Sequence, residues 1–235
     1  MQCERRRFLA VTAALGAGTL GLPSGRVRSQ DNTKNNRTEP ANEEIGATED
    51  LMREHGVLNR ILLIYEEGLR RLRSKEEVPP DVFHKPAHLV RKFVEDYHER
   101  LEERFIFPVF ERQQKLVDLT KVLRQQHEAG RKLTDVILRD AVADRFHKED
   151  ARQEVIRSCE AFIRMYRPHE AREDTVLFPA LHKVVSAKRL QELGEQFEKE
   201  EDRLFGEEGF EKTVDQVAAI EKQLGIHNLA QFTPK

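Results

Sequence analysis

The sequence predicts an all-α protein, an up-down-up-down four-helix bundle followed by a C-terminal helical hairpin. Charged residues make up 35% of the chain, and Gly and Pro are modest in number, a composition that favours helices over sheet. From residue 48 onward, apolar residues recur at steps of three and four, the spacing of one face of an α-helix. Four such segments with short connections between them predict the bundle.

The first two helices are separated by prolines. The first segment begins near Thr48, a suitable N-cap, and Pro79 and Pro80 divide it from the second. The second runs from about residue 86 to 107, because Pro108 disfavours helical geometry in the residue before it. The inner faces predicted for them are Leu51, His55, Leu58, Leu62, Tyr65, Leu69 and Leu72 in the first, and Val90, Val94, His98, Leu101, Glu102 and Phe105 in the second.

The third and fourth helices follow the same pattern. The third runs from about residue 115 to 143, and the fourth starts near Glu149, with Pro168 expected to kink it and Pro179 to end it. Their predicted inner faces are Leu116, Thr120, Leu123, His127, Gly130, Thr134 and Ile137 in the third, and Val155, Cys159, Phe162, Tyr166, His169, Glu173 and Val176 in the fourth.

Two further amphipathic stretches follow the bundle. They span about residues 187–205 and 209–224 and are joined by Gly206. We expect them to pack as a helical hairpin against the bundle. The predicted organisation is therefore a bundle over residues 48–183 and a helical extension over residues 184–235.

The N-terminus differs in composition from the rest. A basic start before a short apolar stretch is typical of an export signal, and the run from Arg5 to Leu9 resembles the twin-arginine signal. The alternative is a basic flank before an ordinary helix. We expect residues 1–30 to be the signal and the polar residues 31–47 to be a disordered linker. The expected location is periplasmic or extracytoplasmic, with membrane contact only if the signal stays uncleaved.

The charge and cysteine content do not indicate a nucleic-acid-binding protein or a disulfide-stabilised domain. The formal net charge is -2, which does not indicate nucleic-acid binding. The two cysteines, Cys3 and Cys159, are divided between the N-terminal extension and the bundle, so no disulfide framework is predicted within the domain. Cys159 falls on an apolar helical face and is expected to be a buried thiol rather than a metal or redox group.

A histidine interrupts each of the four inner faces, at positions 55, 98, 127 and 169. A single inward histidine is usually a hydrogen-bonded core residue. Four of them would each have to leave water and find partners in an apolar core. A shared metal ion is the simpler explanation.

Two of these histidines are followed four residues later by a glutamate. Glu102 follows His98, and Glu173 follows His169, so each pair lies on one helical face. Buried carboxylates without a cation are unfavourable, and the two pairs therefore support each other. The sequence also repeats around them, because both copies place Phe and then Pro at the same offsets, at 107–108 and 178–179.

From Leu51 to Pro179 the chain resembles the hemerythrin-like (HHE) cation-binding domain, notably in segments 50–55, 97–103 and 107–108, and its tail around residues 220–226 resembles extensions of bacterial members. The resemblance implies two non-haem iron ions bridged by carboxylates, with an oxo or hydroxo bridge to offset their charge. Manganese and zinc also suit imidazole and carboxylate ligands and remain open. By resemblance, the terminal ligands are His55, His98, His127 and His169, and the bridges are Glu102 and Glu173.

The resemblance to the oxygen-carrying members is incomplete. They place a further histidine where this chain has Arg131, so efficient reversible oxygen carriage is less expected. They also place an aspartate five residues after the fourth-helix histidine, where this chain has Asp174. The set of predicted ligands, four histidines and two glutamates, is more similar to that of the iron-sensing members. Glu173 is therefore the preferred bridge and Asp174 the alternative.

The other histidines and Tyr166 are not predicted to be metal ligands. Tyr166 lies on the same face as His169, where it would hydrogen-bond near the metals or pack in the core. The remaining histidines are not expected to be ligands: His84, His88, His147, His182 and His227.

Three function classes follow. The preferred one is a di-iron protein that binds or senses O2, an oxidant or iron, with a diatomic or peroxide ligand and output through a protein partner. The alternative is a di-iron enzyme: an oxidase, a peroxidase or a nitric-oxide-handling protein. A structural helical protein without metal does not explain the inward histidines.

Overall fold

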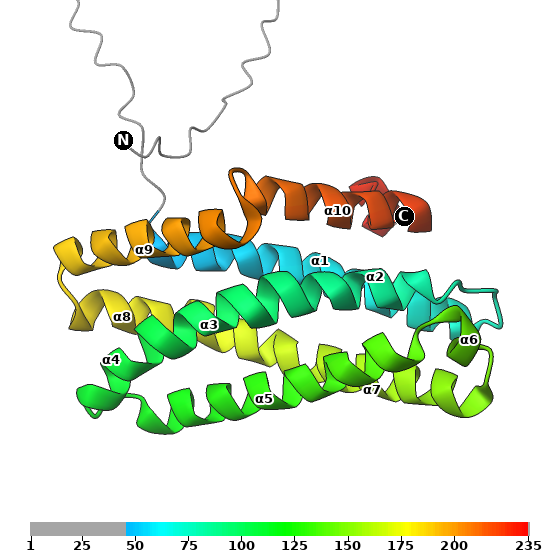
Figure 1. Ribbon diagram of the computed structural model, residues 1–235, viewed down its shortest axis with the longest axis horizontal. Coiled ribbons are helices and arrows are strands. Elements are labelled where there is room, and N and C mark those ends of the chain that lie inside the picture. The colour runs from blue at the N-terminus through cyan, green and yellow to red at the C-terminus, as the bar shows by residue number, and fades with distance from the viewer. Residues whose placement is uncertain (1–45, 235) are drawn as a thin grey trace, which may run out of the picture. The chain divides into compact units, whose positions relative to one another are not determined.

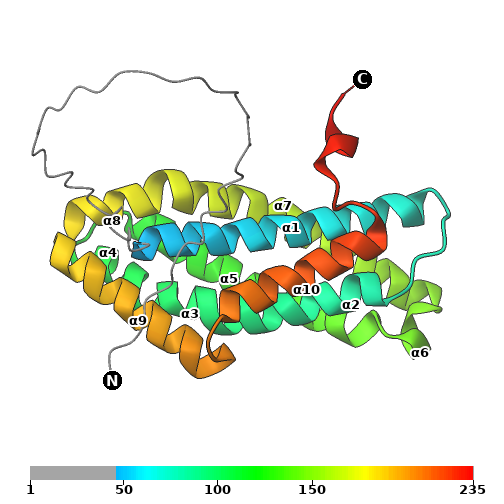
Figure 2. The same ribbon diagram turned by 90° about the horizontal axis from the view of Figure 1, so that it is seen from above.

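The computed structural model describes residues 46–234, which form helices joined by short turns, with no strand in this range. Four long helical runs lie side by side, each reversed in direction from the one before, and two more helices pack outside them (Figures 1 and 2). The predicted all-α bundle is confirmed. The helices are α1 Ala47–Arg73, α2 Asp81–Leu89, α3 Glu99–Leu101, α4 Phe107–Arg112, α5 Val117–Asp140, α6 Ala143–Phe146, α7 Glu149–Arg172, α8 Phe178–Val184, α9 Ala187–Phe205 and α10 Gly209–Leu224, with π-helical turns η1 Val90–His98, η2 Glu102–Ile106 and η3 Glu173–Leu177 and the 3-10 turn η4 Leu229–Phe232.

The N-terminal predictions fall almost entirely outside this range. The export signal and the linker up to residue 45 lie beyond the described residues and stay predictions. Gly46 is the N-cap of α1, so the expectation that Thr48 caps this helix was wrong. Thr48 lies in the first turn instead, where its hydroxyl oxygen is 2.8 Å from Nε2 of His182 on α8.

The second helical run is longer than predicted at both ends. It begins at Asp81 rather than near residue 86, with Pro86 inside α2. Burial of Val82 and Phe83 favours the earlier start, since the Phe83 ring packs 6.4 Å from that of Tyr65 on α1. The run also continues past Pro108 to Arg112.

Pro108 and Pro179 do not end their helices, contrary to the sequence-based expectation, because a π-helical turn precedes each one. The turn η2 begins at Glu102 and η3 at Glu173, and each proline then falls in the first turn of the next α-helix. In that position the missing N–H of proline is not needed for an intrahelical hydrogen bond. The two sequence copies therefore carry the same backbone irregularity, of a kind that often marks functional sites.

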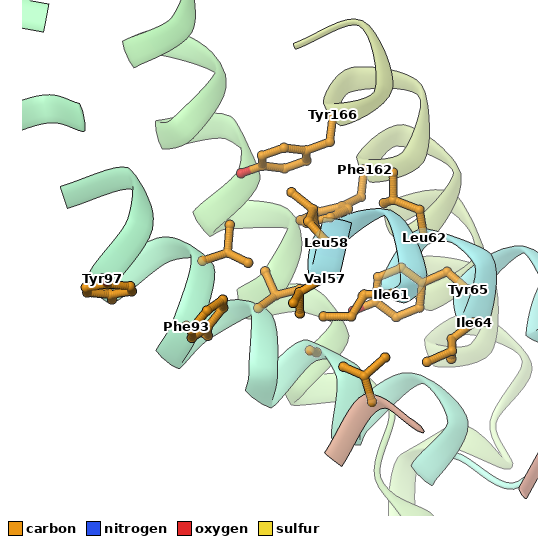
Figure 3. Packing of buried hydrophobic residues seen from close by; sticks show 14 of the residues in the cluster. Val57, Leu58, Ile61, Leu62, Ile64, Tyr65, Phe93, Tyr97, Phe162 and Tyr166 are labelled. Carbon is orange, nitrogen blue, oxygen red and sulfur yellow. The ribbon is translucent and has the colours of Figure 1, made fainter. Parts of the chain in front are cut away.

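Most of the predicted inner faces are fully buried, and large aromatic rings fill the half of the bundle beyond the motifs. Phe162 of α7 meets Tyr65 of α1 edge to face at 5.9 Å and lies 4.3 Å from Tyr166 (Figure 3). Gly130 of α5 lies directly against the Tyr166 hydroxyl, and a Cβ there would overlap it. Cys159 is buried and free, as expected. Within the described residues, no helix has both the length and the apolar character to span a membrane.

The two C-terminal helices have the predicted bounds. Gly206 and Gly225 follow them at φ 71° and 69°, a region of backbone space that favours glycine. Both helices pack on α1, as expected, but they follow one another along the bundle at an angle (Figure 2). They do not fold back side by side, so the expected hairpin between them was wrong. Arg60 of α1 pairs with Glu221 of α10 at 2.6 Å, which ties this extension to the helix that carries His55.

Gly130→Ala is expected to lower the free energy of unfolding by about 1–3 kcal/mol, because the added Cβ would displace Tyr166. Gly56→Ala in α1 is the matched control, since nothing lies within 4 Å of a Cβ at that position. There, the higher helix propensity of alanine should raise stability by about 0.5–1 kcal/mol. Urea unfolding measures both values, and equal effects would contradict the close approach of α5 and α7.

Candidate metal centre

The six residues predicted as ligands meet in the interior of the bundle. His55 comes from α1, His127 from α5 and His169 from α7, while His98 ends η1 and the two glutamates open η2 and η3. All six are almost completely excluded from solvent. The exposed fractions are 2% for His55, 4% for His98 and His169, and 0% for Glu102, His127 and Glu173.

The four imidazoles face each other in two pairs. Nε2 of His55 lies 3.1 Å from Nε2 of His98, and Nε2 of His127 lies 3.3 Å from Nε2 of His169. Each pair thus aims two nitrogen atoms at one point, as two ligands of one cation would. We call the point between His55 and His98 position 1 and the point between His127 and His169 position 2.

Each glutamate reaches both positions. Oε2 of Glu173 lies 3.4 Å from Nε2 of His55 and 3.1 Å from Nε2 of His169. Oε2 of Glu102 lies 3.7 Å from Nε2 of His98 and 3.5 Å from Nε2 of His127. A carboxylate between one histidine of each pair has the placement that a bridging ligand requires.

The glutamate oxygens test whether the site fits a metal. All four carboxylate oxygens of Glu102 and Glu173 are buried without a hydrogen-bond partner. Such groups are rare in folded proteins because burial removes their hydration without replacing it. Burial and the neighbouring Glu173 raise the pKa of Glu102 well above its usual value. Cations between the imidazole pairs would satisfy these oxygens, so the donor set fits.

Asp174, the alternative bridge, lies elsewhere. Its Oδ1 is 2.8 Å from Nδ1 of His55, the nitrogen that points away from position 1. Its side chain is 35% exposed, whereas that of Glu173 is fully buried. Of the two alternatives from the sequence, the structure therefore places Glu173 at the centre and Asp174 behind His55.

The other three histidines also have partners on their outer nitrogens. Nδ1 of His98 is 2.6 Å from Glu54, Nδ1 of His127 is 3.1 Å from Glu103, and Nδ1 of His169 is 2.9 Å from Gln126. An acceptor at Nδ1 holds the proton there and leaves the Nε2 lone pair free for a cation.

The sequence reasoning missed these outer partners, although their spacing repeats. Glu54 and Gln126 each stand directly before a histidine. Glu103 and Asp174 each stand directly after a central glutamate. Each of the last two pairs with the histidine of the other helical hairpin, which only the folded arrangement reveals.

The repeated phenylalanine also has a role at the centre. Phe178 stacks on the ring of His55 with centroids 5.7 Å apart, and Phe107 stacks on His127 at 5.5 Å. Both phenylalanines are fully buried. They cover the two imidazoles from the side and keep water away from them.

A second buried network adjoins position 2. Nη2 of Arg131 is 2.7 Å from both Glu99 and Glu103, and the Tyr166 hydroxyl donates to Glu99 at 2.6 Å. Burial raises the pKa of Glu99 to about 8. Tyr166 therefore fulfils both sequence-based alternatives, since it packs in the core and forms a hydrogen bond near the centre.

The remaining histidines lie apart from the buried cluster. His84 and His88 form a ring pair of their own, with centroids 5.1 Å apart, near the start of the second run. The others are exposed: His147, His182 and His227.

The family model for the hemerythrin HHE cation binding domain matches this chain twice, over residues 46–145 and 118–225. Together the matches cover most of the sequence, and the chain belongs to this family. The second match begins where α5 begins, at the start of the second hairpin, in agreement with the internal repeat. The family match implies a metal-binding domain, and the buried histidine and glutamate clusters are groups that could hold a metal ion.

The relatives extend over nearly the whole chain. The uncharacterized protein Rv1995 of Mycobacterium tuberculosis and the uncharacterized protein Mb2018 of Mycobacterium bovis are each 48% identical over 231 residues, or 97% of this chain and 91% of the relative. No solved structure gives a significant match.

The metal-free protein is expected to lose stability as the pH rises from about 6.5 to about 8. Burial raises the pKa of both Glu99 and Glu170 to about 8, so the folded state holds protons that the unfolded chain has released. His55 acts in the same direction, because its hydrogen bond to Asp174 and the nearby charge of Glu173 outweigh burial and raise its pKa to about 10. Each such group lowers the free energy of unfolding by about 1.4 kcal/mol per pH unit.

His98 and His127 oppose this trend only near pH 6.5, where unfolded histidines are still partly protonated while burial lowers the pKa of both in the folded state. The measurement is urea unfolding of chelator-treated protein across this range. Glu170→Gln should flatten the slope, and a stability that rises with pH would contradict the assignment.

Proposed function

We propose that this protein binds two non-haem iron ions in its bundle and uses them to bind or sense O2 or an oxidant. One observation carries the proposal: two pairs of buried Nε2 atoms are joined by two buried carboxylates that lack hydrogen-bond partners. The ligands would be His55 and His98 at position 1, His127 and His169 at position 2, and Glu102 and Glu173 between them.

Mixed imidazole and carboxylate donors favour iron, manganese or zinc over calcium or magnesium. Iron is proposed because the family resemblance implies it, and because zinc lacks the redox chemistry that oxygen or an oxidant requires. When bound, two iron ions would supply reversible one-electron changes at a site closed to bulk water.

The surrounding side chains hold the ligands in place. Asp174 and Glu54 accept from the outer nitrogens of position 1, and Glu103 and Gln126 accept from those of position 2. Outer contacts of this kind fix ring orientation and increase the basicity of the ligand.

A di-iron enzyme is the second candidate, and one observation favours it. Glu99, with its raised pKa, holds a proton close to position 2 and accepts the Tyr166 hydroxyl hydrogen bond. An oxidase or peroxidase needs such a proton source, whereas a binding protein does not.

His98→Ala and His169→Ala are each expected to abolish full metal occupancy, because each removes one of two nitrogen ligands from a position. His84→Ala should retain it, since His84 lies outside the buried cluster. Each variant is produced in cells supplied with iron, and metal analysis of the purified, folded protein measures the number of metal ions per chain. Two metal ions per chain in His98→Ala would contradict the ligand assignment.

Exposure of the reduced iron protein to O2 separates the two candidates. For a binding protein, we expect an absorption change that reverses when oxygen is removed, with no continued consumption. Steady consumption of O2 or peroxide with a reductant would instead establish an enzyme. In that case Tyr166→Phe should slow turnover while leaving metal content unchanged.

A further inference from the structure

The outer partners of the histidines show that the two halves of the centre are related but unequal. The two hairpins place Glu54 and Gln126 at one equivalent pair of positions, and Asp174 and Glu103 at the other. Every one of these four side chains contacts the Nδ1 atom of a predicted ligand. Any chemical difference between the members of a pair therefore distinguishes position 1 from position 2.

The first pair differs in charge. His98 in position 1 faces a carboxylate oxygen of Glu54 at 2.6 Å, and Glu54 is only 2% exposed. His169 in position 2 faces the neutral amide oxygen of Gln126 at 2.9 Å. Hydrogen bonds to an ionised acceptor are shorter and about twice as strong as neutral ones.

The second pair has equal charge but unequal surroundings. Glu103 is shared among three partners, because Arg131 and Arg100 each lie 2.7 Å from it while His127 lies 3.1 Å away. Asp174 stands closer to its histidine, at 2.8 Å from His55.

We infer that position 1, between His55 and His98, binds a divalent cation more tightly than position 2, and that Glu54 and Gln126 set most of the difference. A carboxylate behind an imidazole increases electron donation to the cation and adds a negative charge nearby. Position 1 has two such carboxylates. Position 2 has one that Arg131 and Arg100 partly neutralise and one uncharged amide. This inference rests on the proposed function, since both positions must bind a cation.

Variants that keep only one of the two positions intact test which position binds a cation more tightly, with Co2+ as the probe. His127→Ala leaves position 1 intact, and His55→Ala leaves position 2 intact. We expect His127→Ala to bind its remaining Co2+ about 10- to 100-fold more tightly than His55→Ala, the range typical of changes behind a metal ligand. Anaerobic titration followed by calorimetry and visible absorption measures both constants.

Exchanging the charge between residues 54 and 126 tests whether these two side chains cause the difference in affinity. Gln126→Glu in the His55→Ala chain should tighten Co2+ binding by about 10-fold, and Glu54→Gln in the His127→Ala chain should weaken it by about 10-fold. Gln125→Glu is the matched control, because it adds the same charge one residue away on an exposed side chain of α5. It should change the affinity little.

A second measurement does not depend on the histidine deletions. In the chain with all four histidines, Gln126→Glu should bring the two Co2+ binding steps closer together, and Gln125→Glu should not. Equal affinities in the single-position variants, or a Gln126→Glu effect no larger than that of Gln125→Glu, would overturn the inference alone. An unaltered chain that binds no Co2+ would overturn the proposed function and the inference together.

Discussion

The central constraint on this protein is the burial of two neighbouring carboxylates among four imidazoles. Glu102 and Glu173 are fully excluded from solvent, and none of their four oxygens has a hydrogen-bond partner. An apolar bundle without a cation gains nothing from such groups, because their hydration is lost without replacement. Nearly every unusual feature nearby, from the paired Nε2 atoms to the stacked phenylalanines, is explained by a cation that these groups would share.

The centre also depends on both helical hairpins at once. Glu103 lies on the first hairpin but contacts His127 of the second, and Asp174 lies on the second but contacts His55 of the first. The phenylalanines of the two motifs cross over in the same way, Phe178 onto His55 and Phe107 onto His127. Each hairpin therefore orients one of its own histidines, His98 through Glu54 and His169 through Gln126, but depends on the other hairpin for its second histidine.

The C-terminal helices contribute from outside. Arg60 pairs with Glu221 of α10, and Arg71 donates to the backbone of Leu224, which hold this extension against α1. Glu201 of α9 is fully buried, and its carboxylate lies within 4.8 Å of that of Glu54, the partner of His98. The extension is therefore continuous with the surroundings of position 1 and is not a separate appendage.

The sequence by itself determined the helical bundle and five of the six central residues, because helical periodicity turns His55, His98, His127 and His169 inward and the four-residue spacing adds Glu102. For the sixth it left two candidates, Glu173 and Asp174. The choice of Glu173 over Asp174 and the roles of the outer partners required the tertiary structure, because they depend on contacts between helices far apart in the chain. The π-helical turns were also invisible to a fixed helical period, although the repeated prolines marked their places. Periodicity specifies which face of a helix is buried, and only packing decides which atoms meet there.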